Sequence, residues 1–370
     1  MMIPPNPKNY ENTSWALAMA DCPQDPEWHP EGDVWTHTQM VFSEATMTIE
    51  SLEFEEERCA VLWAALLHDV AKPVCTRREN GRIIAPGHSR VGAHMAMEIM
   101  EQAGLPGRMR DLVFQLIRFH GRPPWIATKD MELETVELSH FCPGRALHAL
   151  CLADARGRGG DRSTMLQNIE LWRMQAEELN CLDGGFNFPN SHARFRFFHQ
   201  RDHSFLHSPL HFEPKSTLTL TVGLPGAGKD TWVEQHKSEF DEIVSLDELR
   251  ETLHIAPEDE QGRVSQEANR RVKESLAHGC SVLLNSTSLS TQLRDQWGAL
   301  ALSYGARFRL VYIDPGHHIG GTLKICLSRN SKRQSPVPSK VIQKLLTRLT
   351  PPTLAECHEL CIYTGAETTG

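Results

Sequence analysis

The stretch TLTLTVGLPGAGKDTW, residues 217 to 232, decides the fold of the C-terminal half of this chain. An apolar, β-prone run leads into a glycine-rich turn, where Gly223, Gly228 and Lys229 have the G-x-x-x-x-G-K spacing, and a helical pattern follows. In such a turn backbone N–H groups converge on phosphate oxygens, the helix N-terminus adds its positive end, and the lysine reaches the outer phosphates. We therefore expect a nucleotide-binding loop. Its expected binding residues are Gly223, Gly226, Gly228, Lys229, Asp230 and Thr231.

Asp230 stands where such loops usually carry a hydroxyl that holds Mg²⁺. One residue along a helix turns a side chain by about 100°, so Thr231 does not simply take over that position. A carboxylate beside a triphosphate is repulsive unless a cation lies between them, and carboxylate oxygen is itself a good ligand for Mg²⁺. We expect Asp230 to engage Mg²⁺ directly or through its water. The alternative is a site that has lost metal binding and much of its activity.

Working outward, the sequence predicts two domains of different class. Later β-prone runs (EIVSL, CSVLLNS and FRLVYID) alternate with helical stretches, which is typical of an α/β domain with a central parallel sheet. From about residue 34 to 180 apolar residues instead recur at helical spacing, which predicts an all-α domain. A junction rich in Phe and His lies between them. We place the domains at 1–214 (core about 30–182, junction about 184–214) and 215–370.

Charge and cysteine content limit the classes of function. The formal net charge of −9 comes from the N-terminal part: residues 1–214 hold 20 Lys and Arg against 29 Asp and Glu, whereas residues 215–370 hold 18 of each. This balance argues against long-range attraction of nucleic acid, so an anionic substrate must be bound locally or through cations. The ten cysteines form no CxxC pair, and no apolar run approaches the length of a membrane span. We expect a soluble cytoplasmic protein with no membrane partner.

The N-terminal half carries histidines and aspartates that suit a metal centre. LLHDVAKP places His68 beside Asp69, and the strings WHPEGDVWTHT, APGHSRVGAH, RFHGRPP and LADARGR add the remaining candidates. Imidazoles and carboxylates bind divalent transition metals, and a site of this kind collects them from the ends of several helices. The candidate ligands are His37, His68, Asp69, His88, His120 and Asp154. His94 is the alternative to His88, although GAHMAMEIM also fits a helix face on which a histidine simply packs.

The order H…HD…H…H…D resembles the HD phosphohydrolase superfamily. The strings WHPEGDVWTHT and GHSRVGA are similar to those of HD domains found beside RNA-processing enzymes. The resemblance implies two metal ions, manganese or another transition metal, and a bridging water that attacks phosphorus. It assigns one metal to His37, His68, Asp69 and Asp154, and the second to Asp69, His88 and His120. Lys72, one turn after His68, would steady the phosphate.

The C-terminal half contains further candidates for phosphoryl transfer. In VSLDELR, a capping box between Ser245 and Glu248 accounts for a helix start, but Asp247 is also placed to accept a proton from a hydroxyl. The basic segment LSRNSKR, followed by Pro-Val-Pro, suits a mobile lid over phosphates.

Together GLPGAGKDTW, VSLDELR, VLLNSTSLSTQLRDQW and RNSKRQSPVPSKVI resemble the motifs of the P-loop polynucleotide 5′-kinase family. The resemblance implies that Asp247 is the general base, Arg250 contacts an acceptor phosphate, and Arg329 and Arg333 close over the donor phosphates beside Lys229. The family's D-T-N is Ser-Thr-Ser at 286–288 here, which leaves the acceptor contacts of that segment open.

The whole chain resembles the bacterial HD-domain polynucleotide kinase family of bifunctional RNA end-healing enzymes. That resemblance implies RNA ends with 2′,3′-cyclic phosphate or phosphate and 5′-OH groups as substrates, and an NTP (ATP or GTP) with Mg²⁺ as donor. A separate RNA ligase and a second copy of the chain are candidate partners. Two alternatives stay open at this point. One is a small-molecule or nucleoside kinase whose HD domain hydrolyses nucleotides, and the other is a nucleotide-gated RNA-binding sensor without turnover.

Overall fold

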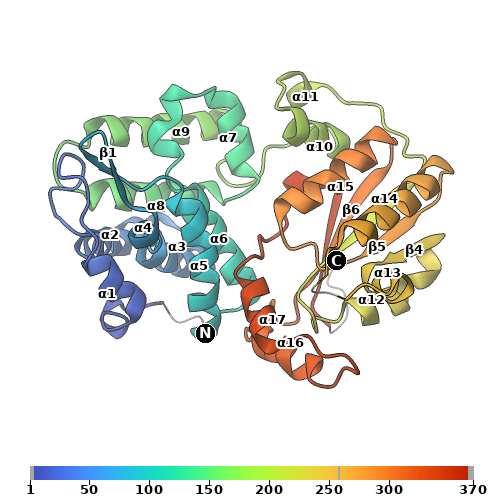
Figure 1. Ribbon diagram of the computed structural model, residues 1–370. Helices are drawn as coiled ribbons and strands as arrows, with labels where there is room; N and C mark the ends of the chain where they lie inside the picture. Colours follow the sequence, from blue (N-terminus) through green and yellow to red (C-terminus); the bar gives the residue numbers. More distant parts are fainter. Residues whose placement is uncertain (1–3, 257–258, 366–370) are drawn as a thin grey trace. The chain divides into compact units, whose positions relative to one another are not determined.

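A computed structural model describes residues 4–256 and 259–365 of the chain, which divides into two compact units, Met1–Asn187 and Phe188–Gly370 (Figure 1). In the described part no helix is long and apolar enough to cross a membrane.

The N-terminal unit is helical. Its elements are η1 (Pro7–Asn9), α1 (Ser14–Ala20), α2 (Val34–Thr48), η2 (Ile49–Ser51), α3 (Glu55–Leu67), α4 (Lys72–Cys75), β1 (Arg77–Glu79), β2 (Arg82–Ile84), α5 (His88–Gln102), α6 (Gly107–Phe119), η3 (Pro123–Thr128), α7 (Met131–Ser139), α8 (Gly144–Arg156) and α9 (Ser163–Glu178).

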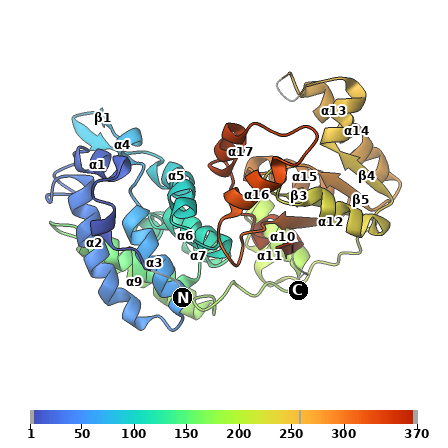
Figure 2. The same ribbon diagram turned by 90° about the horizontal axis from the view of Figure 1, so that it is seen from below.

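Helix α3 forms the centre of this unit. Every residue from Cys59 to Leu67 is buried, because this part of the helix is apolar on all sides and α3 is surrounded by α2, α6 and α8. Helices α5 and α6 lie side by side, as Figure 2 shows. Since α3 ends inside this core, the residues that follow it are placed in the interior of the unit.

A short antiparallel hairpin interrupts the expected all-α domain. Strands β1 and β2 pair across Asn80 and Gly81, both with positive φ (51° and 78°). Asn-Gly flanked by extended residues is the sequence signal for such a two-residue turn, so this hairpin was visible in RRENGRII.

The C-terminal unit is an α/β domain. Its elements are α10 (Ser191–Gln200), α11 (Ser204–His207), β3 (Thr217–Val222), α12 (Lys229–His236), η4 (Lys237–Glu239), β4 (Glu242–Ser245), α13 (Leu246–Leu253), α14 (Gly262–Ala277), β5 (Val282–Asn285), α15 (Thr291–Ser303), β6 (Arg307–Ile313), α16 (Thr322–Asn330), α17 (Ser339–Leu346), η5 (Leu354–Glu356) and β7 (Glu359–Tyr363).

The described strands of this unit form a parallel sheet in the order β4-β5-β3-β6-β7, which confirms the expected central parallel sheet. Strand β3 is central and almost wholly buried, as its apolar sequence requires. After β3 the chain forms β4 and β5 on one side of β3, and it then crosses to form β6 on the opposite side of β3. The loop after β3 therefore lies at a topological switch point. Ligands of parallel α/β sheets bind at such points, outside the carboxyl ends of the strands. Strand β7 was not among the predicted strands.

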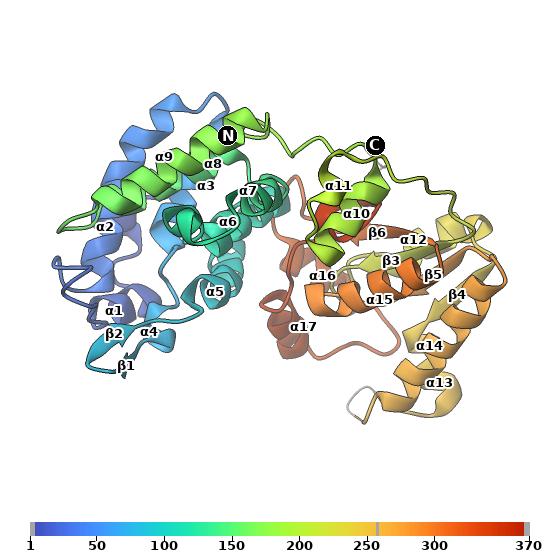
Figure 3. The ribbon, with the colours of Figure 1, turned by 90° about the horizontal axis from the view of Figure 1, so that it is seen from above.

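The boundary between the units differs from the expected division at 214/215. Helix α10 belongs to the C-terminal unit, where it lies next to α15 (Figure 3). His192 on α10 is hydrogen-bonded to His358 at 3.0 Å, and the ring of Phe195 lies 6.2 Å from that of Phe308 on β6. His192, Phe195 and Phe197 of the expected junction are therefore packing residues of the α/β domain, whereas His203, His207 and His211 are exposed.

Candidate active sites

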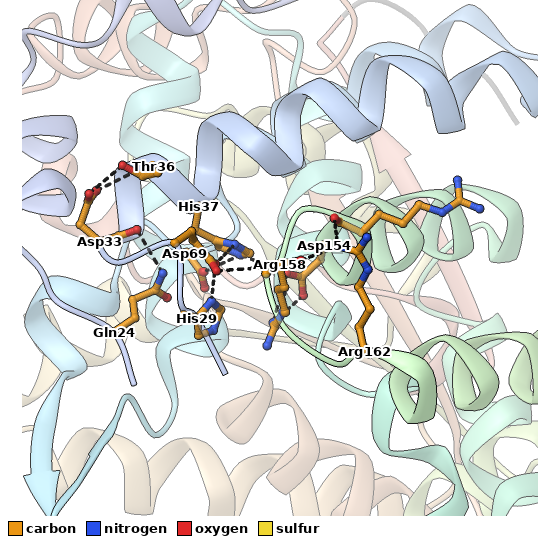
Figure 4. A network of polar contacts seen from close by, with 12 residues as sticks. Gln24, His29, Asp33, Thr36, His37, Asp69, Asp154, Arg158 and Arg162 are labelled. Carbon is orange, nitrogen blue, oxygen red and sulfur yellow. Dashed lines mark hydrogen bonds and ion pairs between the residues drawn. The ribbon is translucent and has the colours of Figure 1, made fainter. Parts of the chain in front are cut away.

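In the N-terminal unit, the candidate ligands of the first metal converge from three places in the fold. His37 lies on α2, His68 and Asp69 follow α3, and Asp154 lies near the end of α8. His37 Nε2 is 3.1 Å from Asp154 Oδ1 and 3.7 Å from Asp69 Oδ2, and His68 Nε2 is 3.1 Å from the same Asp69 oxygen. Figure 4 shows His37, Asp69 and Asp154 turned toward one another.

The candidate ligands of the second metal share Asp69. His88, the first residue of α5, places Nε2 3.3 Å from Asp69 Oδ1. His120, just after α6, stacks edge-on against His68 and His88 at ring-centroid distances of 5.2 and 5.5 Å. Ligand atoms of Asp69, His88 and His120 all lie within 4.8 Å of one another. The other candidate, His94, instead packs edge-on against Phe114 at 5.1 Å.

Backbone carbonyls orient three of these imidazoles in the same way. Nδ1 of His68, His88 and His120 lies 2.9, 2.8 and 2.7 Å from the carbonyl oxygen three residues earlier. A carbonyl only accepts hydrogen bonds, so this contact assigns the proton to Nδ1 and leaves the Nε2 lone pair directed at the cluster. Neutral imidazoles with a free Nε2 are the form that binds metal.

The buried polar atoms at the centre of the cluster fit a divalent metal. His68 Nε2 and both Asp69 carboxylate oxygens are buried and make no hydrogen bond of good geometry with the described residues. Burial alone would raise the pKa of the Asp69 carboxyl, yet the charges of His68 and Lys72 hold that pKa well below its usual range. Burial lowers the pKa of His120 to about 3. A carboxylate and several imidazoles around these buried atoms are the donor set that such an ion takes, and the ion would replace the proton that charges His68.

A buried carboxylate that the sequence analysis missed supports this cluster from behind. Glu31 Oε1 is 2.8 Å from His29 Nδ1 and 2.9 Å from His37 Nδ1, and Oε2 accepts the Gly159 N–H at 3.0 Å. The His37 contact is short, although its angle departs from a good hydrogen bond. Burial lowers the pKa of His29 to about 4, so this imidazole is neutral at pH 7. Both residues stand in WHPEGDVWTHT, and only the fold shows that they face His37.

Two cations border the same cluster. Lys72 Nζ lies 2.7 Å from Asp69 Oδ2 and donates to Gln24 at 2.6 Å. Arg158 contacts both oxygens of Asp154 from the turn after α8, at 2.9 to 3.2 Å. Both side chains line a cavity of about 600 Å³ that also includes His88, His120 and Asp154. The cluster therefore opens onto a space with cationic side chains in its walls.

In the C-terminal unit, the predicted phosphate loop follows β3 and ends in α12. Gly228, at the N-cap of α12, and Gly226 have φ of 115° and 81°, a conformation that favours glycine. Lys229 Nζ donates to the carbonyls of Gly223 and Leu224 at 3.0 and 2.9 Å, so its ammonium group lies over the loop. Burial lowers the pKa of Lys229.

Arg333, from the turn after α16, lies between two carboxylates at the edge of the loop. Its NH2 is 3.8 Å from Asp230 Oδ2 and 3.8 Å from Asp247 Oδ2. Asp247 also pairs with Arg250 at 2.5 Å on the first turns of α13, whose N-terminus is capped by Ser245. The predicted base, the predicted acceptor-binding arginine and one predicted lid arginine are thus neighbours.

The segment around α16 is built against the phosphate loop. A side chain at Gly226 would collide with the Cys326 carbonyl, which explains why this position needs glycine. Arg329 donates to the Ala227 carbonyl at 2.8 Å. Asn330 binds both the N–H and the carbonyl of Val337, which closes the intervening turn. The structure therefore brings both arginines that we predict to form a lid to the loop.

The segment Ser-Thr-Ser at 286–288 presents little to a ligand. Ser286 and Ser288 are buried and their hydroxyls bond to each other, while the Thr287 carbonyl accepts the Gly223 N–H at 3.0 Å. The preceding residue, Asn285, was missed by the sequence analysis. Its amide donates to Asp230 Oδ1 at 2.9 Å, which turns that carboxylate toward the end of β5.

Family comparisons agree with this architecture. Residues 34–156 match the HD domain family, and residues 218–352 match an AAA domain family. The chain joins an HD domain to a P-loop domain of AAA type. The HD match contains every residue of the histidine and aspartate cluster, and the AAA match contains the phosphate loop, Asp247 and both lid arginines.

The curated relatives of this chain include multifunctional CCA proteins. The one from Halorhodospira halophila is 37% identical over 154 residues, which cover 39% of this chain and 34% of that protein. The one from Nitrosomonas eutropha is 30% identical over 176 residues, covering 45% and 40%. This chain thus spans well under half the length of either relative.

Two solved structures are also similar to part of the chain. The Pnkp1/Rnl/Hen1 RNA repair complex matches at 20% identity and a TM-score of 0.31, over 38% of this chain and 46% of the other. A gluconokinase from Sinorhizobium meliloti 1021 matches at 17% identity and a TM-score of 0.29, over 42% and 86%. At such TM-scores neither structure bears on function.

Proposed function

We propose that this protein heals broken RNA ends: the HD domain hydrolyses 2′,3′-cyclic phosphate and phosphomonoester ends, and the P-loop domain phosphorylates 5′-OH ends. The observation that carries the proposal is the combination, in one chain, of a buried metal-ligand cluster that opens onto a cationic cavity and a phosphate loop beside Asp247 and Arg333. Many ribonucleases leave a 2′,3′-cyclic phosphate on one side of the break and a 5′-hydroxyl on the other, so one chain would repair both ends.

In the HD domain, His37, His68, Asp69 and Asp154 would hold one metal ion, and Asp69, His88 and His120 a second. Bound divalent metals would supply charge stabilisation for a phosphoryl group and an activated water. Lys72 and Arg158, which neutralise Asp69 and Asp154 in the structure, are placed to contact phosphate oxygens from the cavity wall.

In the P-loop domain, Lys229 would bind the outer phosphates of an NTP, and Arg329 and Arg333 would neutralise charge on the transferred group. Asp247 would accept the proton of the attacking 5′-hydroxyl, and Arg250, which pairs with it, would contact a phosphate of the acceptor strand. Asp230, held by Asn285 at the edge of the loop, would be the carboxylate that engages Mg²⁺.

An RNA oligonucleotide with 5′-OH and 2′,3′-cyclic phosphate ends tests both halves. It is incubated with the protein, Mn²⁺, Mg²⁺ and a labelled NTP, and both termini are resolved. We expect both ends to change, with Asp69→Ala abolishing only the 3′ reaction and Lys229→Ala only the 5′ reaction. Exchanges of the exposed Asp161 and Lys237 for alanine are matched controls. Phosphorylation of free nucleosides in preference to the oligonucleotide would overturn the polynucleotide kinase assignment.

A further inference from the structure

Two exposed tryptophans stand at the cavity of the HD domain. Trp28 is 37% exposed and Trp125 47%, and their rings meet edge-on with centroids 6.1 Å apart. Apolar side chains that are exposed together, unlike those exposed singly, mark a binding surface. Trp28 comes from the turn before α2 and Trp125 from η3, so only the fold brings them together.

The chain holds both indole-bearing segments in place. Asn168 on α9 donates to the Pro124 carbonyl at 2.8 Å, next to Trp125. On the other side, Asp25 accepts N–H groups from Glu27 and Ile83 at 3.1 Å each, which ties the turn that carries Trp28 to strand β2. The indoles therefore form a preorganised wall of the cavity.

The same cavity contains an arginine without a carboxylate partner among the described residues. Arg82, Arg122 and Arg158 line it, and each is paired with a carboxylate. Arg118 also lines it, but it forms no ion pair within the described ranges of the chain, and its guanidinium lies 5.7 Å from the Phe119 ring centroid. A partly buried guanidinium without a carboxylate partner is suited to a phosphate group.

We propose that Trp28 and Trp125 form a nucleobase subsite of the HD cavity, and that Arg118 binds the phosphate that links the terminal nucleotide to its neighbour. The inference rests on the proposed function, because it places an RNA 3′ end in this cavity, with its terminal phosphate toward His88, His120 and Asp154. Every base has a π-face that can stack on an indole. We therefore expect the subsite to accept all four bases.

A pair of cyclic phosphates with and without a base tests the tryptophans. Adenosine 2′,3′-cyclic phosphate and glycerol 1,2-cyclic phosphate share the five-membered phosphodiester ring, and only the first can stack. Loss of a base–aromatic stack weakens binding about tenfold. We expect Trp28→Ala and Trp125→Ala each to raise KM about tenfold for the adenosine ester and to leave kcat/KM for the glycerol ester unchanged. Trp→Phe variants should recover most of the loss.

Phe54→Ala is the matched control, because Phe54 is a large exposed aromatic residue (61%) that lies outside this cavity. For Arg118, the substrate pair is a mononucleotide and a dinucleotide that both end in 2′,3′-cyclic phosphate. Arg118→Ala should remove the dinucleotide's advantage in KM, and Arg118→Lys should restore part of it. Equal losses on the base-free ester, or no loss on the adenosine ester, would overturn the subsite.

Direct binding separates the subsite from the esterase assignment. If the parent hydrolyses no cyclic phosphate, adenosine 3′-monophosphate is titrated by calorimetry into the Lys229→Ala protein, in which the phosphate loop is disabled. Binding that is lost in the Trp28→Ala/Trp125→Ala double variant would support the subsite although the esterase assignment fails. Absent binding, or binding that the double variant retains, would overturn the subsite, and an apolar peptide would then be the occupant to test.

Discussion

Replacing Glu31 with glutamine probes how the HD domain prepares His37 for metal. The carboxylate faces Nδ1 of both His29 and His37 at 2.8 and 2.9 Å, and its second oxygen accepts the Gly159 N–H. Burial would raise the pKa of Glu31, but the hydrogen bond from His29 and the close contact with His37 hold that pKa well below its usual range. His37 Nε2 contacts Asp154 Oδ1 at 3.1 Å here; with a metal ion bound at Nε2 instead, the proton of His37 would lie on Nδ1, where Glu31 would accept it.

The expected magnitude follows from what glutamine cannot do. Its single oxygen cannot accept from both imidazoles and from Gly159, and its NH₂ group adds a donor in a place that needs an acceptor. A hydrogen bond to a charged group contributes about 1.5–3 kcal/mol, or roughly 10- to 150-fold in an equilibrium constant. Substitutions behind metal-bound histidines typically cost about 10- to 100-fold in metal affinity. We expect Mn²⁺ affinity to fall by about 10- to 100-fold.

The assay is a calorimetric Mn²⁺ titration of the metal-free protein, accompanied by the Mn²⁺ dependence of esterase activity and a thermal melt. Glu27→Gln is the matched control, because Glu27 lies four residues earlier, is exposed and pairs with Arg82. An unchanged Mn²⁺ affinity in a folded Glu31→Gln protein would refute the role of Glu31 in orienting His37. Equal losses in both variants would point to a general effect of charge.

Three further outcomes are expected. Asp230→Asn should keep the contact with Asn285 but lower kinase turnover at saturating Mg²⁺ and NTP by about 100-fold or more, because a charged metal ligand is lost. An unchanged turnover would mean that this carboxylate does not engage the metal. In the parent protein Arg294 pairs with both carboxylate oxygens of Glu356 at 2.7 and 3.1 Å, so Arg294→Met leaves an uncompensated buried charge and should destabilise the P-loop domain by about 3–5 kcal/mol in urea unfolding. A loss below about 1 kcal/mol would contradict this. Burial lowers the pKa of His358 to about 3, so below about pH 6.5 the unfolded chain binds a proton that the folded chain does not, and the free energy of unfolding falls as the pH falls. His358→Gln should therefore flatten the decline in urea stability between pH 7 and pH 5, and parallel curves for the two proteins would refute this.

Features that depend on a few neighbouring residues could be predicted from the sequence. The phosphate loop needs glycines, a lysine, a preceding strand and a following helix, all within residues 217–232. The His-Asp pair at 68 and 69 follows a helix that is apolar on all sides, so its burial was implied as well. In both cases the feature could be predicted because neighbouring residues alone specify it.

Tertiary structure decided the features that join distant segments. Glu31 lies behind His37 only because the turn before α2 folds back on the helix, and nothing in WHPEGDVWTHT separates a ligand from its support. Trp28 and Trp125 are 97 positions apart. The boundary between the units precedes the expected one because α10 packs on a strand more than 100 residues later in the chain. Such contacts are set by which apolar faces bury one another, a balance summed over the whole chain, whereas a phosphate loop is specified by the conformations of the few residues that form it.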